Sequence, residues 1–178
     1  MESLEQGHEP RHPAGLLLAL VGALVAGLAV SALAWVADAR WRANATADLV
    51  LAFDETLSAV EIAERRVQSV AEYTRPARDR ADMDPSERES LDELVRDAAS
   101  ESAADIATQR SRVDAVRLLP WHADLRIARD QAGAWLDLRA TGIVSLATTG
   151  RTEYAPREQL DSARTALRDA WEAIRSQE

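Results

Sequence analysis

Hydrophobic and polar positions divide this chain sharply near residue 38. Residues 14–37 read AGLLLALVGALVAGLAVSALAWVA, a run without a charged side chain in which Ser31 is the only conventionally polar residue. A helix of that length rises about 36 Å, which is enough to cross a hydrocarbon core of about 30 Å. The run therefore predicts a transmembrane helix over residues 14–37, in contact with the lipid bilayer.

Beyond the span, apolar residues recur every three or four positions, which is the helical period. No run alternates between apolar and polar residues as a half-buried strand would. We expect helices at about 43–75, 85–118, 121–148 and 156–176, joined by short connections that place neighbours antiparallel. The sequence thus predicts an all-α protein, with a single N-terminal transmembrane helix followed by an antiparallel four-helix bundle within residues 38–178.

Each expected bundle helix carries one apolar stripe, which we assign to the core. The first stripe has the spacing of a heptad seam, and nothing interrupts the chain between the span and this helix. The four stripes are Leu49, Phe53, Thr56, Val60, Ala63, Val67, Val70 and Thr74; Leu91, Val95, Ala98, Ser102, Ile106, Gln109, Val113 and Val116; Leu125, Ala128, Ala132, Trp135, Leu136, Ile143 and Leu146; Leu160, Ala163, Leu167, Trp171 and Ile174.

Prolines and glycines mark the expected ends of these helices. The first should end at Arg75, because the residue before Pro76 is pushed out of the α region. The second begins at Pro85, with Asp84 as its N-cap. Pro120 opens the third helix from a turn, and Gly150 closes it. Pro156 takes the first position of the last helix, and Gly133 and Gly142, inside the third, indicate close helix crossings.

Residues 1–13 are predicted to be a disordered polar tail. They contain His8, Glu9 and His12 in the spacing H-E-x-x-H, which binds Zn²⁺ when a helix places both histidines on one face. Pro10 lies between the two histidines and would disrupt that helix. The pattern therefore does not predict a zinc protease.

The apolar run can be an uncleaved signal anchor or a cleaved signal peptide. Ala32-Leu33-Ala34 and Ala37-Asp38-Ala39 both resemble cleavage sites, but the run is about twice the length of a normal h-region. We therefore favour the anchor. Arg11 before the span and Arg40 and Arg42 after it differ too little in number to decide the orientation, and their count leans towards a cytoplasmic C-terminus. A short tail, one span and a large following domain are typical of an exported, extracytoplasmic C-terminal domain.

Composition narrows the possible partners. All 21 basic residues are arginine and alanine is abundant, which is typical of a GC-rich and hence bacterial genome, and there is no cysteine. Residues 38–178 hold 20 of the basic residues and 27 of the 30 acidic ones, a net charge of −7. This balance disfavours nucleic acid, whose binding requires excess positive charge.

No residue pattern in the sequence predicts catalysis, a metal site or a cofactor. Glu61 and Glu64 are one turn apart, but the Glu-x-x-His pairs of a di-iron bundle are missing, and we expect a solvated helix face. His122 follows Pro120 and Trp121, so we expect a helix-start residue and not a general base. Asn44-Ala45-Thr46 is a sequon that matters only in a host that glycosylates it. We therefore expect a protein that is not an enzyme.

The layout resembles the membrane-anchored helical sensor domains of bacterial receptors, which however carry a second span and a signalling module. We therefore expect an accessory or structural subunit of a bacterial membrane complex, and keep an extracytoplasmic ligand-sensing or binding bundle as the alternative. A pocket lined by Trp135 and Trp171 with converging polar groups would favour the ligand-binding bundle. A long exposed apolar strip on the bundle would favour the accessory subunit.

The expected partner is another protein or a second copy of the chain. The span itself offers a surface for a second copy, since small residues recur every four positions along it and let helix backbones approach closely. These residues are Gly15, Ala19, Ala23, Gly27 and Ser31.

Overall fold

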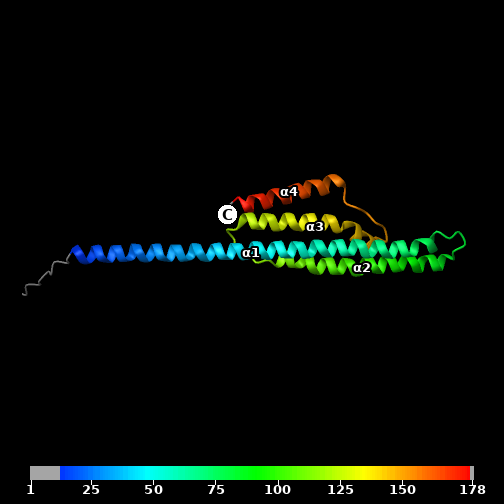
Figure 1. Cartoon of the computed structure of the whole chain (residues 1–178), viewed down its shortest axis with the longest axis horizontal. Coiled ribbons are helices and arrows are strands. Elements are labelled where there is room, and N and C mark those ends of the chain that lie inside the picture. The colour runs from blue at the N-terminus through cyan, green and yellow to red at the C-terminus, as the bar shows by residue number, and fades with distance from the viewer. Residues whose placement is uncertain (1–12, 177–178) are drawn as a thin grey trace, which may run out of the picture. The chain divides into compact units, whose positions relative to one another are not determined.

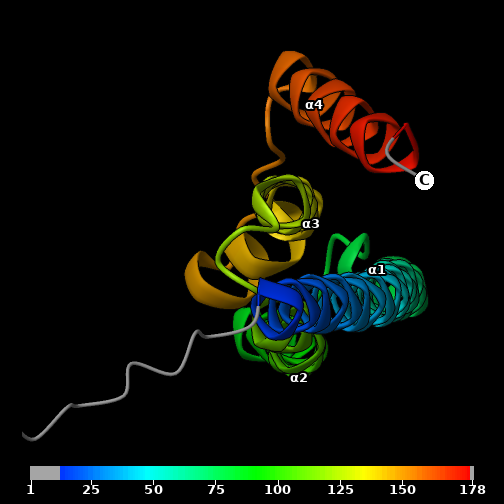
Figure 2. The same cartoon turned by 90° about the vertical axis from the view of Figure 1, so that its left-hand side faces the viewer.

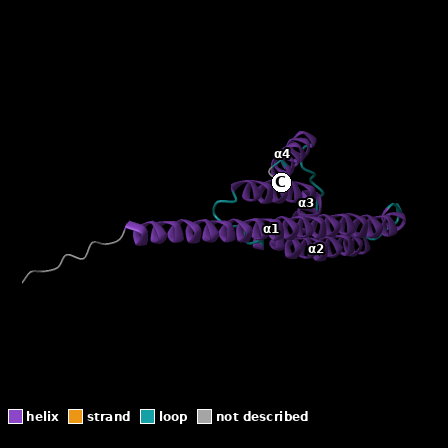
Figure 3. Cartoon of the chain, turned by 60° about the vertical axis from the view of Figure 1, so that its left-hand side comes forward, coloured by secondary structure: helices purple, strands orange, loops and turns teal. Residues whose placement is uncertain are grey.

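The computed structural model describes residues 13–176, with side chains from residue 17 onward. Within that range every regular element is a helix (Figure 3). The helices are α1 (Pro13–Arg78), α2 (Pro85–Ala115), α3 (Ala123–Thr149) and α4 (Arg157–Arg175), labelled in Figure 1. The all-α prediction is confirmed, whereas the predictions for the tail before Pro13 lie outside the described residues.

The chain divides into two compact units, Met1–Ala43 and Asn44–Glu178. The second unit contains the later part of α1 together with α2, α3 and α4. These four segments run alternately in opposite directions (Figure 1), as short connections between neighbouring helices require. The antiparallel order of the bundle is therefore as predicted.

Helix α1 is one element of 66 residues, so the predicted span and the predicted first bundle helix belong to a single helix. It ends at Arg78 and not at Arg75, with Pro76 inside its last turn. A proline there removes only one backbone donor, and the turn still closes because the Asp79 N–H donates to the Arg75 carbonyl at 2.9 Å. Arg78 also pairs with Asp92 of α2 at 2.8 Å, which holds the last turn against the bundle.

The predicted cap of α2 is present. The Asp84 carboxylate accepts hydrogen bonds from the Ser86 backbone N–H at 2.8 Å and from the Ser86 hydroxyl at 2.7 Å. The hydroxyl and backbone bonds both favour the ionised form, so the pKa of Asp84 is lowered. At the other end α2 stops at Ala115, three residues before the predicted end, because Val116 already has an extended ψ of 120°.

The remaining boundaries lie within two residues of the predictions. Helix α3 begins at Ala123, after a turn in which the His122 N–H donates to the Leu119 carbonyl at 3.0 Å. The helix ends before Gly150, which has a φ of 70° in the left-handed region, and this confirms the predicted C-terminal glycine. Pro156 is the N-cap of α4 and not its first helical residue.

The core of the bundle consists of two clusters of buried side chains. The first draws on all four helices, and the second draws only on α1, α2 and α3. Helix α4 therefore completes the core at one end of the bundle, and in Figure 2 it lies over α3. The first cluster comprises Ala45, Leu49, Ala52, Val113, Leu125, Ala128, Leu136, Ala170 and Ile174; the second comprises Val60, Ala63, Ile106, Ala140 and Ile143.

Most predicted core positions are buried. In α1 the heptad seam is confirmed at Leu49, Thr56, Val60, Ala63 and Thr74. In α2 the buried alanine is Ala99 and not Ala98, which is half-buried. Other predicted core positions, among them Phe53, Val67, Trp135 and Trp171, are only partly buried, so the phenyl and indole rings lie at the edge of the core.

The core contains buried hydroxyl groups with different surroundings. The Thr56 hydroxyl donates to the Ala52 carbonyl at 2.7 Å. The Ser102 hydroxyl, in a residue only 1% exposed, has no hydrogen-bond partner among the described residues. A buried hydroxyl without a partner keeps the full cost of its desolvation.

Replacing Ser102 by alanine should therefore raise the free energy of unfolding, by up to about 1 kcal/mol, because the change removes an unsatisfied group. Thr56→Val is the control, since it removes a hydroxyl that is bonded, and it should lower the free energy of unfolding by about 0.5–1.5 kcal/mol. Denaturant unfolding followed by circular dichroism measures both. A clear loss of stability in Ser102→Ala would show that its hydroxyl has a partner.

Leu167→Ala should lower the free energy of unfolding by about 2–5 kcal/mol, the usual cost of truncating a core leucine. Leu167 is 6% exposed, and it holds α4 on the bundle. Leu94→Ala is the control, because Leu94 is 51% exposed on α2 and should change stability little. Equal effects of the two variants would place α4 outside the cooperative core.

Candidate functional site

The first feature with functional meaning is the apolar N-terminal part of α1. Its leucine, valine and tryptophan side chains from residue 17 to residue 36 are all exposed, from 41% at Val36 to 75% at Leu18. The Ser31 hydroxyl donates to the Gly27 carbonyl at 2.9 Å, so this polar group is satisfied within the helix. Among the described residues, α1 is the one helix long and apolar enough to cross a membrane.

The polar residues considered as candidate ligands or catalytic groups in the sequence do not converge on one site. His8, Glu9 and His12 lie outside the described residues. His122 is 2% exposed and occupies the N-cap position of α3, as expected for a helix-start residue. The Glu64 carboxylate accepts a hydrogen bond from Arg139, whereas the side chain of Glu61 lies on an exposed position. Within the described part of the chain, no three potential metal ligands gather.

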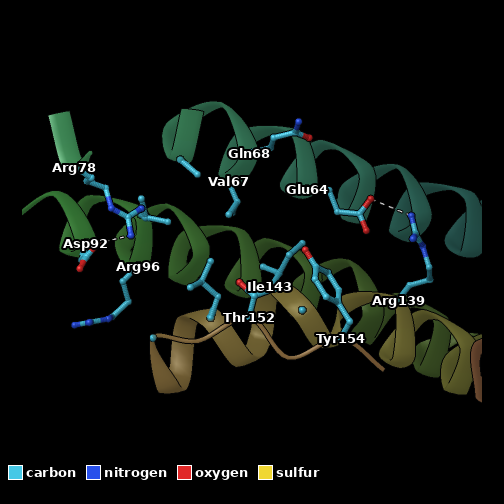
Figure 4. A pocket seen from close by; sticks show the side chains of 15 residues that line it. Glu64, Val67, Gln68, Arg78, Asp92, Arg96, Arg139, Ile143, Thr152 and Tyr154 are labelled. Atoms are coloured by element: carbon cyan, nitrogen blue, oxygen red, sulfur yellow. Dashed lines mark hydrogen bonds and ion pairs between the residues drawn. The ribbon is translucent and has the colours of Figure 1, made fainter. Parts of the chain in front are cut away.

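Among the described residues, the bundle has three hollows of about 600–620 Å³ that contain functional groups, and one of them lies between α2 and α3 beside Arg110. We call the first the loop pocket, because the connection from α3 to α4 forms one of its walls (Figure 4). Its volume is about 600 Å³, and α1, α2 and α3 form the other walls. It lies beside the core cluster to which α4 contributes no residue. Its lining includes Val67, Gln68, Val95, Ile143, Leu146, Thr152 and Tyr154.

The wall formed by the connecting loop is fixed to α3 by hydrogen bonds. The Ser145 hydroxyl accepts from the Glu153 N–H at 2.8 Å, and the Thr149 hydroxyl accepts from the Arg151 N–H at 3.2 Å. Gly142 then faces the ring of Tyr154, where a Cβ would lie 2.7 Å from Cε1. The close approach at Gly142 is therefore that of a loop side chain and not the predicted helix crossing.

Two ion pairs line the loop pocket (Figure 4). Arg139 contacts Glu64 at 3.0 Å and Arg78 contacts Asp92 at 2.8 Å, so four of its charges are neutralised in pairs. Arg96 is different, because its guanidinium lies over Gly150 and makes no ion pair with any described residue. The pocket offers polar contacts on an apolar floor.

We call the second hollow the indole groove, because Trp135 of α3 and Trp171 of α4 both line it. It lies between α1, α3 and α4 and has a volume of about 610 Å³. The rings of Phe53 and Trp135 form one wall, with centroids 5.8 Å apart and planes inclined at 38°. Its rim carries four arginines, Arg139, Arg164, Arg168 and Arg175, and two acids, Glu61 and Asp161.

The two tryptophans of this groove were singled out in the sequence, but its arginines were not. The sequence does indicate that these residues share one face of a helix. The spacings between Arg164, Arg168, Trp171 and Arg175 are four, three and four. Sequence alone does not show that this face of α4 looks across to Phe53 of α1.

A third group of charges lies between α2 and α3. Arg110 contacts Asp114 at 2.7 Å and Asp137 at 3.0 Å. Burial lowers the pKa of Arg110, but the two carboxylates outweigh burial, so the pKa is raised and the guanidinium stays charged. This side chain covers Gly133, where a Cβ would collide with it, so Gly133 also does not mark a helix crossing.

Comparison of the chain with protein-family models, with curated proteins and with solved structures finds no match. Any inference about function therefore depends on the residues and their arrangement alone.

The pair between Glu64 and Arg139 should have a coupling free energy of about 0.2–1 kcal/mol, because both side chains are more than a third exposed and water screens them. A double-mutant cycle with Glu64→Gln and Arg139→Gln measures this coupling. The pair between Arg157 and Asp161, at 3.8 Å and with side chains 95% and 69% exposed, is the control and should show almost none. Coupling of zero at Glu64 would mean that the pair does not form in solution.

Proposed function

We propose that this chain is a single-pass membrane protein whose helical bundle acts by binding a protein partner, as an accessory or structural subunit of a bacterial membrane complex. The observation that carries the proposal is the exposure of every large apolar side chain from residue 17 to residue 36. Soluble monomers rarely expose a continuous apolar surface of this extent, whereas lipid accommodates it.

The length of the apolar run supports a permanent anchor over a cleaved signal peptide. The run of 24 residues without a charge exceeds the 7–15 residues of a normal h-region. We propose that the anchor leaves the C-terminal domain outside the cytoplasm, which is the usual result of a short N-terminal tail followed by one span.

Arginine and carboxylate side chains support binding as the mode of action. On the bundle they form pairs between helices, such as Arg66 with Glu101 at 3.5 Å and with Asp105 at 3.6 Å, and Arg112 with Glu55 at 2.7 Å. Charged side chains of both signs at the rim of an interface give specificity and correct orientation for a partner. A second copy of the chain is another candidate partner.

A second function, a ligand-binding or ligand-sensing bundle outside the cytoplasm, is favoured by one specific observation. Trp135 and Trp171 line one groove together with arginine and carboxylate side chains. Apolar walls with a small number of polar groups are typical of small-molecule sites. The exposed large apolar residues of α1 beyond Asn44 include the adjacent pair Val50 and Leu51, and Ile62 three turns further on, with polar residues between the pair and Ile62.

A reporter that is active only outside the cytoplasm should give signal when fused after Glu178, because the proposed topology exports the bundle. The matched fusion carries a reporter active only inside and should be silent. A stronger signal from the internal reporter would reverse the proposed orientation.

Fractionation of cells that express the protein tests whether residues 14–37 remain as a membrane anchor. The mature protein should sediment with membranes, resist extraction at alkaline pH and have a mass that includes residues 14–37, because an uncleaved span retains it in lipid. Replacing Leu24 and Leu28 by arginine should reduce its membrane fraction, since a charge at the centre of a span costs about 2.5–3.5 kcal/mol. Recovery of a soluble species beginning near Trp35 or Arg40 would instead show a cleaved signal peptide.

A further inference from the structure

We propose that the indole groove binds a small organic anion, in which a carboxylate is carried on an apolar or aromatic body. The proposal deepens the second function above, the ligand-binding bundle, and does not depend on the membrane anchor. It identifies the class of ligand from the chemistry of the groove.

The groove exists because α4 covers only part of the bundle. The fully buried residues of α4 are Leu167, Ala170 and Ile174, all in its C-terminal half, while Leu160 in its first turn is only half-buried. The second core cluster contains no residue of α4. The first half of α4 therefore leaves uncovered a surface that α1 and α3 share.

The walls of the groove are suited to an apolar or aromatic body. Phe53 and Leu57 of α1, Trp135 of α3, and Leu160 and Trp171 of α4 all contribute and are partly buried, so their remaining surface is available to a ligand. A volume of about 610 Å³ lies within the range of about 300–1,000 Å³ that small-molecule sites have. Three helices contribute at one place, which favours a compact ligand over an extended chain.

The charges at the rim select an anion. Arg139 is neutralised by Glu64 at 3.0 Å, and Arg168 has two carboxylates of its own helix at 3.5 and 4.0 Å. Arg164 and Arg175 make no ion pair with any described residue. A guanidinium binds a carboxylate with two parallel hydrogen bonds, so either of these arginines is suited to hold the charged end of a ligand. The two are eleven residues apart on α4, about 16.5 Å along the helix, and therefore offer two alternative positions for that charge.

The opposing acids do not cancel this charge. The lining carboxylates are Glu61 and Asp161, and Asp161 lies 3.8 Å from Arg157 of its own helix. Taken alone, the residues that line the groove carry four arginines against two carboxylates, on a chain whose net charge is −9. Such a local reversal of sign provides charge complementarity for an anion.

The experiment uses the full chain in nanodiscs of zwitterionic phosphatidylcholine, with empty nanodiscs as the blank. Three carboxylates serve as probes: 3-phenylpropionate, indole-3-acetate and octanoate. The neutral alcohol 3-phenylpropan-1-ol has the same apolar body as the first probe and no charge. Titration calorimetry or ligand-observed NMR gives each Kd. At least one carboxylate should bind saturably, and 3-phenylpropionate should bind about tenfold more tightly than its alcohol.

The double variant Arg164→Gln with Arg175→Gln should weaken carboxylate binding about tenfold or more. The matched control is Arg126→Gln with Arg151→Gln, which changes the net charge equally at two exposed positions outside the groove and should leave Kd unchanged. All four arginines are exposed, and circular dichroism should confirm that both variants keep the helical fold.

Three results would overturn the proposal: no saturable binding of any probe, equal affinity for the alcohol and the carboxylate, or equal losses in the two double variants. None of them affects the membrane anchor, which fractionation and the reporter fusions test separately. The failure of this site is therefore distinguishable from the failure of the anchored bundle.

Discussion

Close packing through small side chains is the constraint on which the bundle depends. Among the described residues, eight of the eighteen buried apolar ones are alanine, and the larger side chains that are fully buried are few, led by Leu49, Leu125 and Leu136. An alanine buries little apolar area, so each one stabilises such a core only slightly. Its small side chain lets neighbouring helices approach closely, and the few large residues then pack against one another between the helices. The wide rings of Phe53, Trp135 and Trp171 remain at its edge, and there they form the wall of a groove.

The sequence was most informative where one local signal decides the structure. A charge-free run of 24 residues specified the apolar helix, the spacing of four and three specified the buried face of α1, and Asp84 before Pro85 specified the start of α2. The helix end predicted from Pro76 was wrong, because a proline in the last turn of a helix removes only one hydrogen bond, which other contacts can offset. Local signals describe helices well but leave open what each helix faces.

The features that the sequence did not predict all depend on contacts between distant segments. Gly133 accommodates Arg110 of α2, and Gly142 accommodates Tyr154 of the following loop. The spacing of a glycine in a helix cannot distinguish these neighbours from another helix. The same limit applies to the arginines of α4, whose common face was visible in the sequence although the aromatic surface opposite them was not.

The charge of the chain and the charge of the groove act over different distances. A net charge of −9 repels anions at long range, and it also repels an anionic lipid surface from the bundle. At physiological ionic strength this repulsion is screened beyond about 8 Å, so an anion that reaches the groove responds mainly to the nearest arginines. An acidic chain and a groove lined with arginines are therefore compatible, because a ligand whose apolar body lies in the groove is held beside the exposed side chain of Arg164 or Arg175. The indole and phenyl walls thus select the body of a ligand, and a guanidinium group at the rim selects its charge.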